Sequence, residues 1–476
     1  MDRTDSYRPD VRGLPMVHPP DPARLEAERA WLAEVSKRPW LGRQLAYLSR
    51  GGPGYLQSAL TLGGGSASAC ILAGAAFGYQ LLWVAPLGMI LGGIVFAAIA
   101  HQTLSTGMRP FEAMRRHAGG FFAWGWAIGT VIASVVWHFA QYSLASAVLV
   151  DLAAVAGWEV PRWAMGLLVL AWAVPTALSF GSRSGFQRGF ERLIRAMVWM
   201  IVALFAVVAI RVGFGDPAAI ASGFVPRVPP DLDLPGGKVS AVAVVISGLA
   251  TAIGVNMTFL YPYSLLARGW GREHRELARA DLVMGMVVPF TIVTSLVVIV
   301  SAATLHEGFS GKSISPIEAA GTLGSLLGPV AGRVAFDLGL LAMLLTTITL
   351  HMVCSGLACG EMFKLRVGSP GYRLATLLPA PGVLGSVYWT SLSIWVAVPT
   401  SIVAGFLLPL AYVGFIRLQA SSAYLGSDRP RGVKGALWLA GMAIATLVVV
   451  VFLGWYLVEK GPAFLEMLRP SAETAA

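Results

Sequence analysis

Two glycine-centred segments interrupt long apolar runs of this 476-residue chain, near 63–66 and near 254–258. Inside a helix each glycine costs about 1 kcal/mol relative to alanine. If the runs cross a membrane, backbone groups released there must face a cavity or a bound ligand. We therefore expect both helices to break and to offer backbone groups and side chains to a small solute or ion. The candidate binding residues are Gly63, Gly64, Gly65 and Ser66 in the first segment, and Asn256, Met257 and Thr258 in the second.

A second set of polar residues lies in the apolar run 121–150. His138 and Gln141 are one helical turn apart and therefore share a face. An ionisable residue inside a membrane is a functional candidate, and histidine titrates near neutral pH. We interpret the pair as candidates for coupling transport to an ion, with a neutral imidazole bonded between helices as the alternative. For His351, in the run 335–361, packing hydrogen bonds are the preferred interpretation.

The elements that must position these residues are predicted to be membrane-spanning helices. Hydrophobic residues make up 56% of the chain and charged residues 13%, about half the charged share of soluble domains. The mean hydropathy is +0.68. A spanning helix needs about 20 mostly apolar residues, which predicts an all-α protein of the lipid bilayer. The eleven candidate runs lie near 55–76, 81–100, 121–150, 163–180, 193–212, 239–267, 282–305, 335–361, 372–389, 390–417 and 433–458.

The charge distribution predicts how the chain is oriented. The net charge is +10, but the basic residues are scattered over short loops, which argues against nucleic-acid binding. If the N-terminus is cytoplasmic, the inner loops hold 22 lysines and arginines and the outer loops hold 8. Cationic loops stay on the cytoplasmic side. We expect a multi-pass protein of the inner membrane, with its N-terminus in the cytoplasm and its C-terminus outside.

The spacing of the two breaks suggests an internal repeat. Five runs precede the second break and five begin with it, and paired interruptions of this kind mark the central site of secondary transporters. We predict a cytoplasmic tail over 1–50, partly amphipathic, and a transporter core over 51–417. The core divides into repeats over about 51–212 and 239–417. A loop, an eleventh helix and a short tail occupy 418–476.

Several stretches resemble the Nramp family of divalent-metal transporters. The most specific runs from Gly52 to Leu56 and continues at 73–84, and weaker matches are Ser105 to Arg109, Leu260 to Ser264 and 317–320. The resemblance covers roughly 50–417. It implies a LeuT-like fold with a 5+5 inverted repeat and discontinuous helices 1 and 6. It also implies proton-linked uptake of Mn²⁺ or Fe²⁺ at the two breaks.

The residues at the breaks depart from those of the family. Members place Asp-Pro-Gly-Asn at the first break, so that the metal-binding aspartate is absent at Gly63 and asparagine is replaced by Ser66. Members place Met-Pro-His at the second break, where Asn256, Met257 and Thr258 stand here. Two acidic residues of the third helix correspond to His138 and Gln141. In a LeuT-like fold Thr346 and Thr347 lie where hydroxyls hold Na⁺, which makes sodium an alternative to protons for coupling, and plain helix packing a third interpretation.

The sequence leaves three functional interpretations open. The first is a transporter of a divalent cation, for which the oxygen-rich residues favour Mg²⁺ over Mn²⁺ or Fe²⁺. The second is a carrier of a carboxylate or amino-acid-like solute, bound at a half-helix N-terminus. The third is a sensor or scaffold that keeps the fold without transport. No nucleophile constellation, P-loop or dinucleotide fingerprint occurs, so we expect neither an enzyme nor a bound cofactor.

Overall fold

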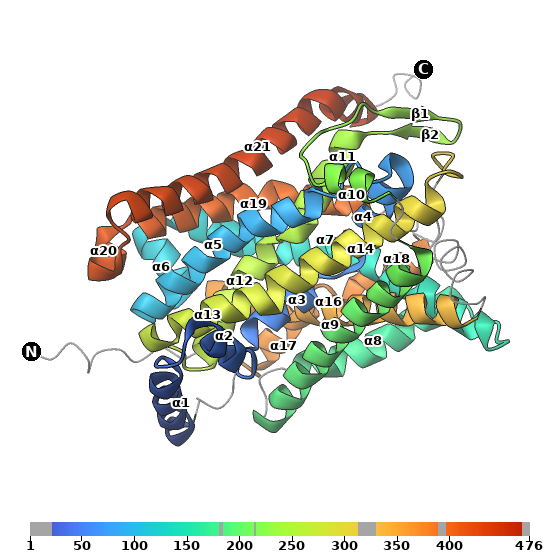
Figure 1. The fold of residues 1–476 in the computed structure, drawn as a ribbon. Coiled ribbons are helices and arrows are strands. Elements are labelled where there is room, and N and C mark those ends of the chain that lie inside the picture. Colours follow the sequence, from blue (N-terminus) through green and yellow to red (C-terminus); the bar gives the residue numbers. More distant parts are fainter. Residues whose placement is uncertain (1–20, 180–183, 214–215, 313–329, 389–396, 469–476) are drawn as a thin grey trace, which may run out of the picture.

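The structure is a computed structural model that describes residues 21–179, 184–213, 216–312, 330–388 and 397–468. The family-like motif at 317–320 and both chain ends, 1–20 and 469–476, lie outside the described residues. Within the described part the chain is helical, apart from one short hairpin of strands β1 (Leu232–Leu234) and β2 (Gly237–Val239) (Figure 1).

Nine helical stretches of the described residues are long and apolar enough to cross a membrane, and one bent pair makes a tenth. The bent pair is α3 (Pro53–Thr61) with α4 (Gly64–Phe77). The others are α5 (Val84–Thr106), α7 (Gly120–Val155), α8 (Arg162–Ser179), α9 (Ser184–Val212), α11 (Ala241–Ala252) with α12 (Val255–Ala267), α13 (Arg275–Leu282) continuing into α14 (Val288–Leu305), α16 (Ala331–Phe363), α19 (Ala397–Ala420) and α21 (Gly432–Leu468). These stretches confirm the predicted all-α membrane fold.

The ninth predicted span, 372–389, is not one continuous helix. The chain forms α17 (Pro370–Leu377), the 3₁₀ turn η3 (Ala380–Leu384) and α18 (Gly385–Tyr388). Pro379 and Pro381 lack the N–H groups that would continue α17. The segment packs closely against the middle of α7, where Gly382 approaches His138.

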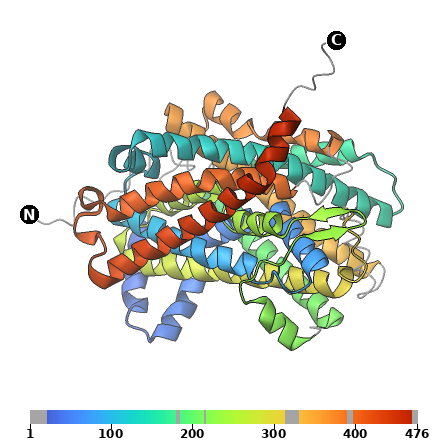
Figure 2. The same ribbon diagram turned by 90° about the horizontal axis from the view of Figure 1, so that it is seen from above.

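The broken helices occupy the centre of the bundle. In the stretch 241–267, 94% of the most apolar window is buried, whereas the corresponding share for α21 is 17%. Seen from above, α21 lies over the outside of the bundle (Figure 2). Helix α7 packs against α16 and α19, and α4 packs against α11 and α14. The two breaks are therefore enclosed by other helices, whereas α21 faces the lipid.

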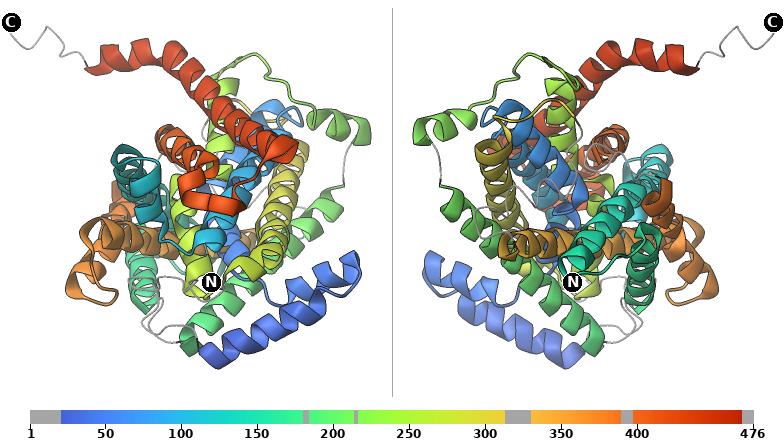
Figure 3. Two further views of the ribbon diagram at one scale, coloured as in Figure 1. Left: turned by 90° about the vertical axis from the view of Figure 1, so that its left-hand side faces the viewer. Right: turned by 90° about the vertical axis from the view of Figure 1, so that its right-hand side faces the viewer.

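Short helices close the two ends of the bundle. We call the end that carries α1 (Pro22–Val35), α2 (Trp40–Leu48), α6 (Pro110–His117) and α20 (Ser422–Leu425) the N-terminal end, and the opposite end, with the β1–β2 hairpin and α10 (Pro217–Gly223), the hairpin end (Figure 1). Figure 3 shows α1 and α2 at the margin of the N-terminal end. Arg29 pairs with Glu273 at 2.7 Å, and Tyr47 donates to Glu276. The predicted amphipathic stretch is therefore two helices docked on the bundle.

Candidate functional site

The first break turns the chain by 54° between α3 and α4. The Ser66 hydroxyl bridges the turn: it donates to the Thr61 carbonyl at 2.7 Å and accepts from the Gly63 N–H at 3.1 Å. The Gly64 N–H, at the start of α4, donates to Oε1 of Gln141 at 3.0 Å. A hydroxyl and a neutral amide therefore satisfy backbone groups that a continuous helix would pair internally.

Little space surrounds the backbone at Gly63. A Cβ atom on Gly63 would lie 2.7 Å from Oγ1 of Thr347 and 3.2 Å from Nε2 of Gln141. Real Cβ atoms do not approach other atoms as closely as the first of these distances. An aspartate at this position, as the resemblance would imply, does not fit the observed packing of α7 and α16. Loss of the carboxylate and close approach of the helices therefore go together.

The second break lies between α11 and α12 at Ile253 and Gly254. The Gly254 N–H donates to the thioether sulfur of Met257 at 3.2 Å, which turns that sulfur back towards the break. Oδ1 of Asn256 accepts from the Met257 N–H at 2.9 Å, while Nδ2 of Asn256 is buried without a partner among the described residues. An unpaired buried N–H donor is costly, so Nδ2 would be stabilised by a water oxygen or another acceptor in the cavity and would not itself ligate a cation.

The two breaks meet across a shared contact. The Thr61 hydroxyl, at the end of α3, donates to the Thr251 carbonyl at 2.7 Å, at the end of α11. A cavity of about 20 Å³ lies between them. Its lining comprises Leu60, Thr61, Gly63, Gly65, Ser66, Trp137, Gln141, Thr251, Gly254, Asn256, Met257, Thr347 and His351. Every one of these residues is buried, and the volume suits one water molecule or one small ion.

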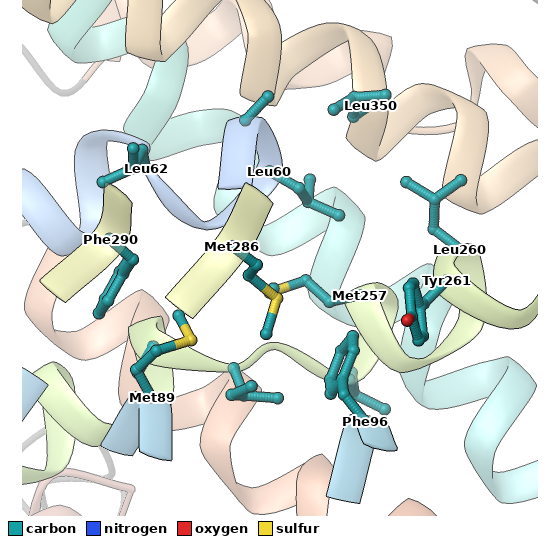
Figure 4. Packing of buried hydrophobic residues seen from close by; sticks show 14 of the residues in the cluster. Leu60, Leu62, Met89, Phe96, Met257, Leu260, Tyr261, Met286, Phe290 and Leu350 are labelled. Carbon is teal, nitrogen blue, oxygen red and sulfur yellow. The ribbon is translucent and has the colours of Figure 1, made fainter. Parts of the chain in front are cut away.

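The cavity lining carries donor atoms but no charged side chain. Met257 supplies a thioether, His351 an imidazole, and Asn256 and Gln141 amide oxygens. Within the described ranges no cluster of three or more His, Cys, Asp or Glu is positioned to hold a metal ion. A cation at this site would therefore be held by neutral ligands from several helices. Figure 4 shows Met257 within the packed apolar cluster that also contains Leu60 and Met286.

His351 lines the cavity, although the sequence predicts only packing hydrogen bonds for it. Its ring stacks on Trp137 at 5.4 Å and lies 5.5 Å from the ring of His138, measured between centroids. Nδ1 of His351 has no partner in the part of the chain that the structure describes. The signal was present in the sequence, because His351 follows Thr347 by four residues and so lies on the same helical face. This spacing predicts a site role for His351 only when Thr347 is known to face the first break.

The other predicted coupling residues take different positions. His138 contacts His351 but is not part of the cavity lining; its Nδ1 hydrogen-bonds the Ser134 carbonyl at 3.0 Å, and its Nε2 has no partner within the described ranges. Oγ1 of Thr346 and Oγ1 of Thr347 each lie 3.2 Å from the carbonyl oxygen of Ala59, in the last turn of α3. Thr347 lines the cavity, whereas Thr346 does not. Their roles in coupling stay predictions.

Thr258 is directed away from the cavity. Its hydroxyl accepts from the indole N–H of Trp126 at 2.9 Å and donates to the Val255 carbonyl at 2.6 Å. It is not among the cavity-lining residues. With both hydrogen-bonding capacities used, Thr258 holds α12 against α7 in this structure.

Comparison with known proteins gives the family. Residues 54–459 match the Nramp family, described as natural resistance-associated macrophage protein-like. The chain belongs to the Nramp family. It is 23% identical over 441 residues to the divalent metal cation transporter MntH of Mesorhizobium japonicum, covering 90% of this chain and 92% of the relative. Nramp proteins are membrane transporters, which agrees with the enclosed central cavity and the broken helices.

Solved structures confirm the fold of this Nramp protein. A mutant of a manganese transporter from Eremococcus coleocola superimposes with a TM-score of 0.72 at 17% identity, covering 91% of this chain and 90% of that one. MhsT in complex with L-phenylalanine superimposes with a TM-score of 0.54 at 13% identity, covering 84% and 98%. The LeuT-like architecture predicted from the resemblance is confirmed.

A carboxylate does contact the broken first helix, but at its start rather than at its break. The two carboxylate oxygens of Asp281 accept from the N–H groups of Gly52 and Gly54, each at 2.7 Å, and the side chain is 3% exposed. Arg268 donates to the Arg50 carbonyl at 3.0 Å, and Arg195 donates to the Gly51 carbonyl. These contacts fasten the N-terminal end of α3 to α13, to the end of α12 and to α9.

Proposed function

We propose that this Nramp protein is a secondary transporter for a divalent transition-metal cation, which binds between the breaks of α3–α4 and α11–α12. Family membership and the relatives named as divalent metal cation transporters support this class of substrate. The cavity supports it independently, because its volume of about 20 Å³ accommodates one small ion. Pockets for organic ligands are commonly about 300–1,000 Å³, so an organic solute would require a large expansion of the site.

The donor atoms favour transition metals over Mg²⁺. The observation that carries this choice is that Met257 and His351 line the same buried cavity. Thioether and imidazole groups are ligands for softer divalent metals, whereas Mg²⁺ prefers an octahedron of oxygens and retains its waters. The residue types at the breaks alone favoured Mg²⁺, because the sequence did not bring His351 to the site or direct Met257 towards it.

The neutral lining should lower the affinity of the cavity for a divalent cation. A divalent charge that leaves water loses much hydration energy, and no carboxylate of the cavity lining compensates for it. The C-terminal ends of α3 and α11 direct carbonyl dipoles towards the breaks, which partly offsets this cost. We expect weaker metal binding than a site with an aspartate would give, and faster release.

Alternating access requires one end of the bundle to open while the other stays closed. The Asp281 contacts hold the start of α3 closed at the N-terminal end. Release of this carboxylate would free α3 to move away from α13, while α4 stays packed on α14. In the proposed cycle the metal passes through this end after α3 opens.

The direct test is metal influx into proteoliposomes that contain the purified protein. Zn²⁺, Fe²⁺, Mn²⁺ and Mg²⁺ are offered separately, beside empty liposomes. Met257→Leu removes the thioether with little change in volume. Met286→Leu is the matched control, because Met286 is equally buried but does not line the cavity.

Saturable influx of one or more transition metals is expected, with little Mg²⁺ influx. Met257→Leu should reduce transition-metal influx by about tenfold or more, and Met286→Leu should leave it within about twofold. Equal effects of the two variants would refute the role of Met257. Influx of Mg²⁺ alone would restore the oxygen-site interpretation. Absence of influx for all four metals would leave the organic-solute and the transport-inactive interpretations.

A further inference from the structure

A second cavity, larger than the first, lies at the N-terminal end of the bundle between α5, α13 and the start of α21. Its volume is about 410 Å³, within the range of ligand pockets. Ten residues line it: Ala97, Ala100, His101, Arg275, Arg279, Asp428, Pro430, Arg431, Lys434 and Trp438. Four of them are cationic and one is acidic, so the lining is strongly positive. The transport mechanism proposed above uses none of these residues.

Three of the four cations have no acidic partner among the described residues. Asp428 pairs with Arg275 at 3.0 Å and with Arg272 at 2.7 Å, so its charge is already compensated. For Arg279, Arg431 and Lys434, no carboxylate of the described residues lies within ion-pair distance. Like charges that converge on one pocket repel one another. An anion that enters the pocket would relieve this repulsion.

The remaining walls of the pocket are aromatic and apolar. The indole of Trp438 lies 5.3 Å from the ring of His101, measured between centroids, and its N–H donates to the Ile94 carbonyl at 3.3 Å. His101 in turn hydrogen-bonds the Asp428 carbonyl at 2.9 Å. These contacts fix one wall of the pocket on α5. Tryptophan beside a cluster of cations is typical of the level at which lipid headgroups lie.

The pocket adjoins the surface of the bundle that faces the lipid. Val433 and Leu437, in the first turns of α21, are 76% and 67% exposed. Figure 2 shows α21 on the outside of the bundle beside α5. An acyl chain could follow this apolar face while its headgroup occupies the cationic pocket. A free inorganic anion would use the cations but not the apolar face.

We propose that this pocket binds the phosphate headgroup of an anionic phospholipid, with the acyl chains along α21. Arg279, Arg431 and Lys434 hold the phosphate, and Trp438 packs against the glycerol region. Juxtamembrane cations attract anionic lipids most strongly at the cytoplasmic leaflet, and the positive-inside count places the N-terminal end there. The lipid would tie the start of α21 to α5 and α13.

The test measures lipid affinity of the whole protein by native mass spectrometry in detergent. Phosphatidylglycerol is titrated against the wild type and against the triple variant Arg279→Gln, Arg431→Gln, Lys434→Gln. The matched control carries Lys364→Gln, Arg366→Gln and Arg373→Gln, which removes three exposed charges from the loop after α16 and from α17, at the same end. The single variant Lys434→Gln gives a readout if the triple variant folds poorly. Phosphatidylcholine and inorganic phosphate serve as the zwitterionic and the free-anion probes.

Wild type and control should bind phosphatidylglycerol with equal affinity. The pocket variant should bind it about tenfold or more weakly, and Lys434→Gln about threefold to fivefold more weakly. Phosphatidylcholine should bind weakly to all of them. Equal affinity of the pocket variant and the control would overturn the proposal. So would displacement of phosphatidylglycerol by inorganic phosphate at a similar concentration, because the site would then recognise a free anion.

Discussion

The broken first helix begins twice, and the chain caps the two beginnings in opposite ways. At the start of α3, the Asp281 carboxylate accepts from two backbone N–H groups, with Arg268 and Arg195 bonded to neighbouring carbonyls. At the start of α4, in the centre of the bundle, the amide of Gln141 and the hydroxyl of Ser66 accept instead. Both devices satisfy helix N-termini, but only the first carries charge.

The difference shows where this protein can use a charge for structure. At the end of the bundle, Asp281 has arginines nearby, and a carboxylate at a helix N-terminus is further stabilised by the helix dipole. In the centre, a permanent charge without a partner would be costly. Neutral caps stabilise the break there, so that a bound cation would be the charged group of the site. The same chemistry explains why a carboxylate could be lost from the break without loss of the fold.

The largest expected effect comes from removal of the charged cap. Asp281→Ala leaves two buried N–H groups unpaired beside Arg268 and should lower the free energy of unfolding by about 3–5 kcal/mol. Asp216→Ala is the control, since Asp216 caps α10 by accepting from the Ala218 N–H at 2.8 Å, but is exposed. It should cost about 1 kcal/mol. Thermal unfolding in detergent measures the stability of both variants. Equal losses of stability would contradict the proposal that Asp281 holds the start of α3 closed.

A smaller loss of stability is expected at the neutral cap, where the cause is a steric clash and not the loss of a charge. Gly63→Ala places a Cβ against Thr347 and should cost about 1–3 kcal/mol. The double variant with Thr347→Ala should recover part of this loss, because the clashing atoms are removed. Gly120→Ala is the control, because its added Cβ would meet no described atom within 4 Å beyond its chain neighbours and its own helix backbone. It should change stability by less than about 0.5 kcal/mol. If Gly63→Ala behaves like Gly120→Ala, the close approach is not required.

The smallest expected effect comes from a charge added to the neutral cap. Gln141→Glu keeps an oxygen for the Gly64 N–H and adds a carboxylate to the cavity lining. It should tighten divalent-cation binding by about tenfold, which corresponds to about 1.4 kcal/mol. Isothermal titration with Zn²⁺ or Mn²⁺ measures the change, and Gln57→Glu, which is buried but outside the lining, controls for charge alone. Unchanged affinity in Gln141→Glu would show that cations do not enter this cavity.

The sequence predicted the membrane fold well because its signals are local. Apolar length identified the spans, and the glycines at 63–65 identified the break that the structure places between α3 and α4. Pro379 and Pro381, visible in the sequence, divide the predicted span 372–389 into three short helices. These features depend on residues within one segment of the chain.

The composition of the candidate site was less predictable because it depends on tertiary packing. His351 reaches the cavity only because α16 crosses the first break, and Thr258 leaves it because Trp126 engages its hydroxyl. The sulfur of Met257 turns towards the break through a bond to Gly254. No spacing along the chain specifies these three contacts. They change the expected metal from Mg²⁺ to a softer ion.

In the proposed site a divalent transition metal binds at the helix breaks through the Met257 thioether, without a carboxylate. X-ray absorption at the zinc edge of the Zn²⁺-loaded protein shows whether sulfur is a ligand. The spectrum should contain a sulfur scatterer in the first coordination shell, which is lost in Met257→Leu and kept in Met286→Leu. A first shell of oxygen and nitrogen alone, unchanged in Met257→Leu, would contradict the claim.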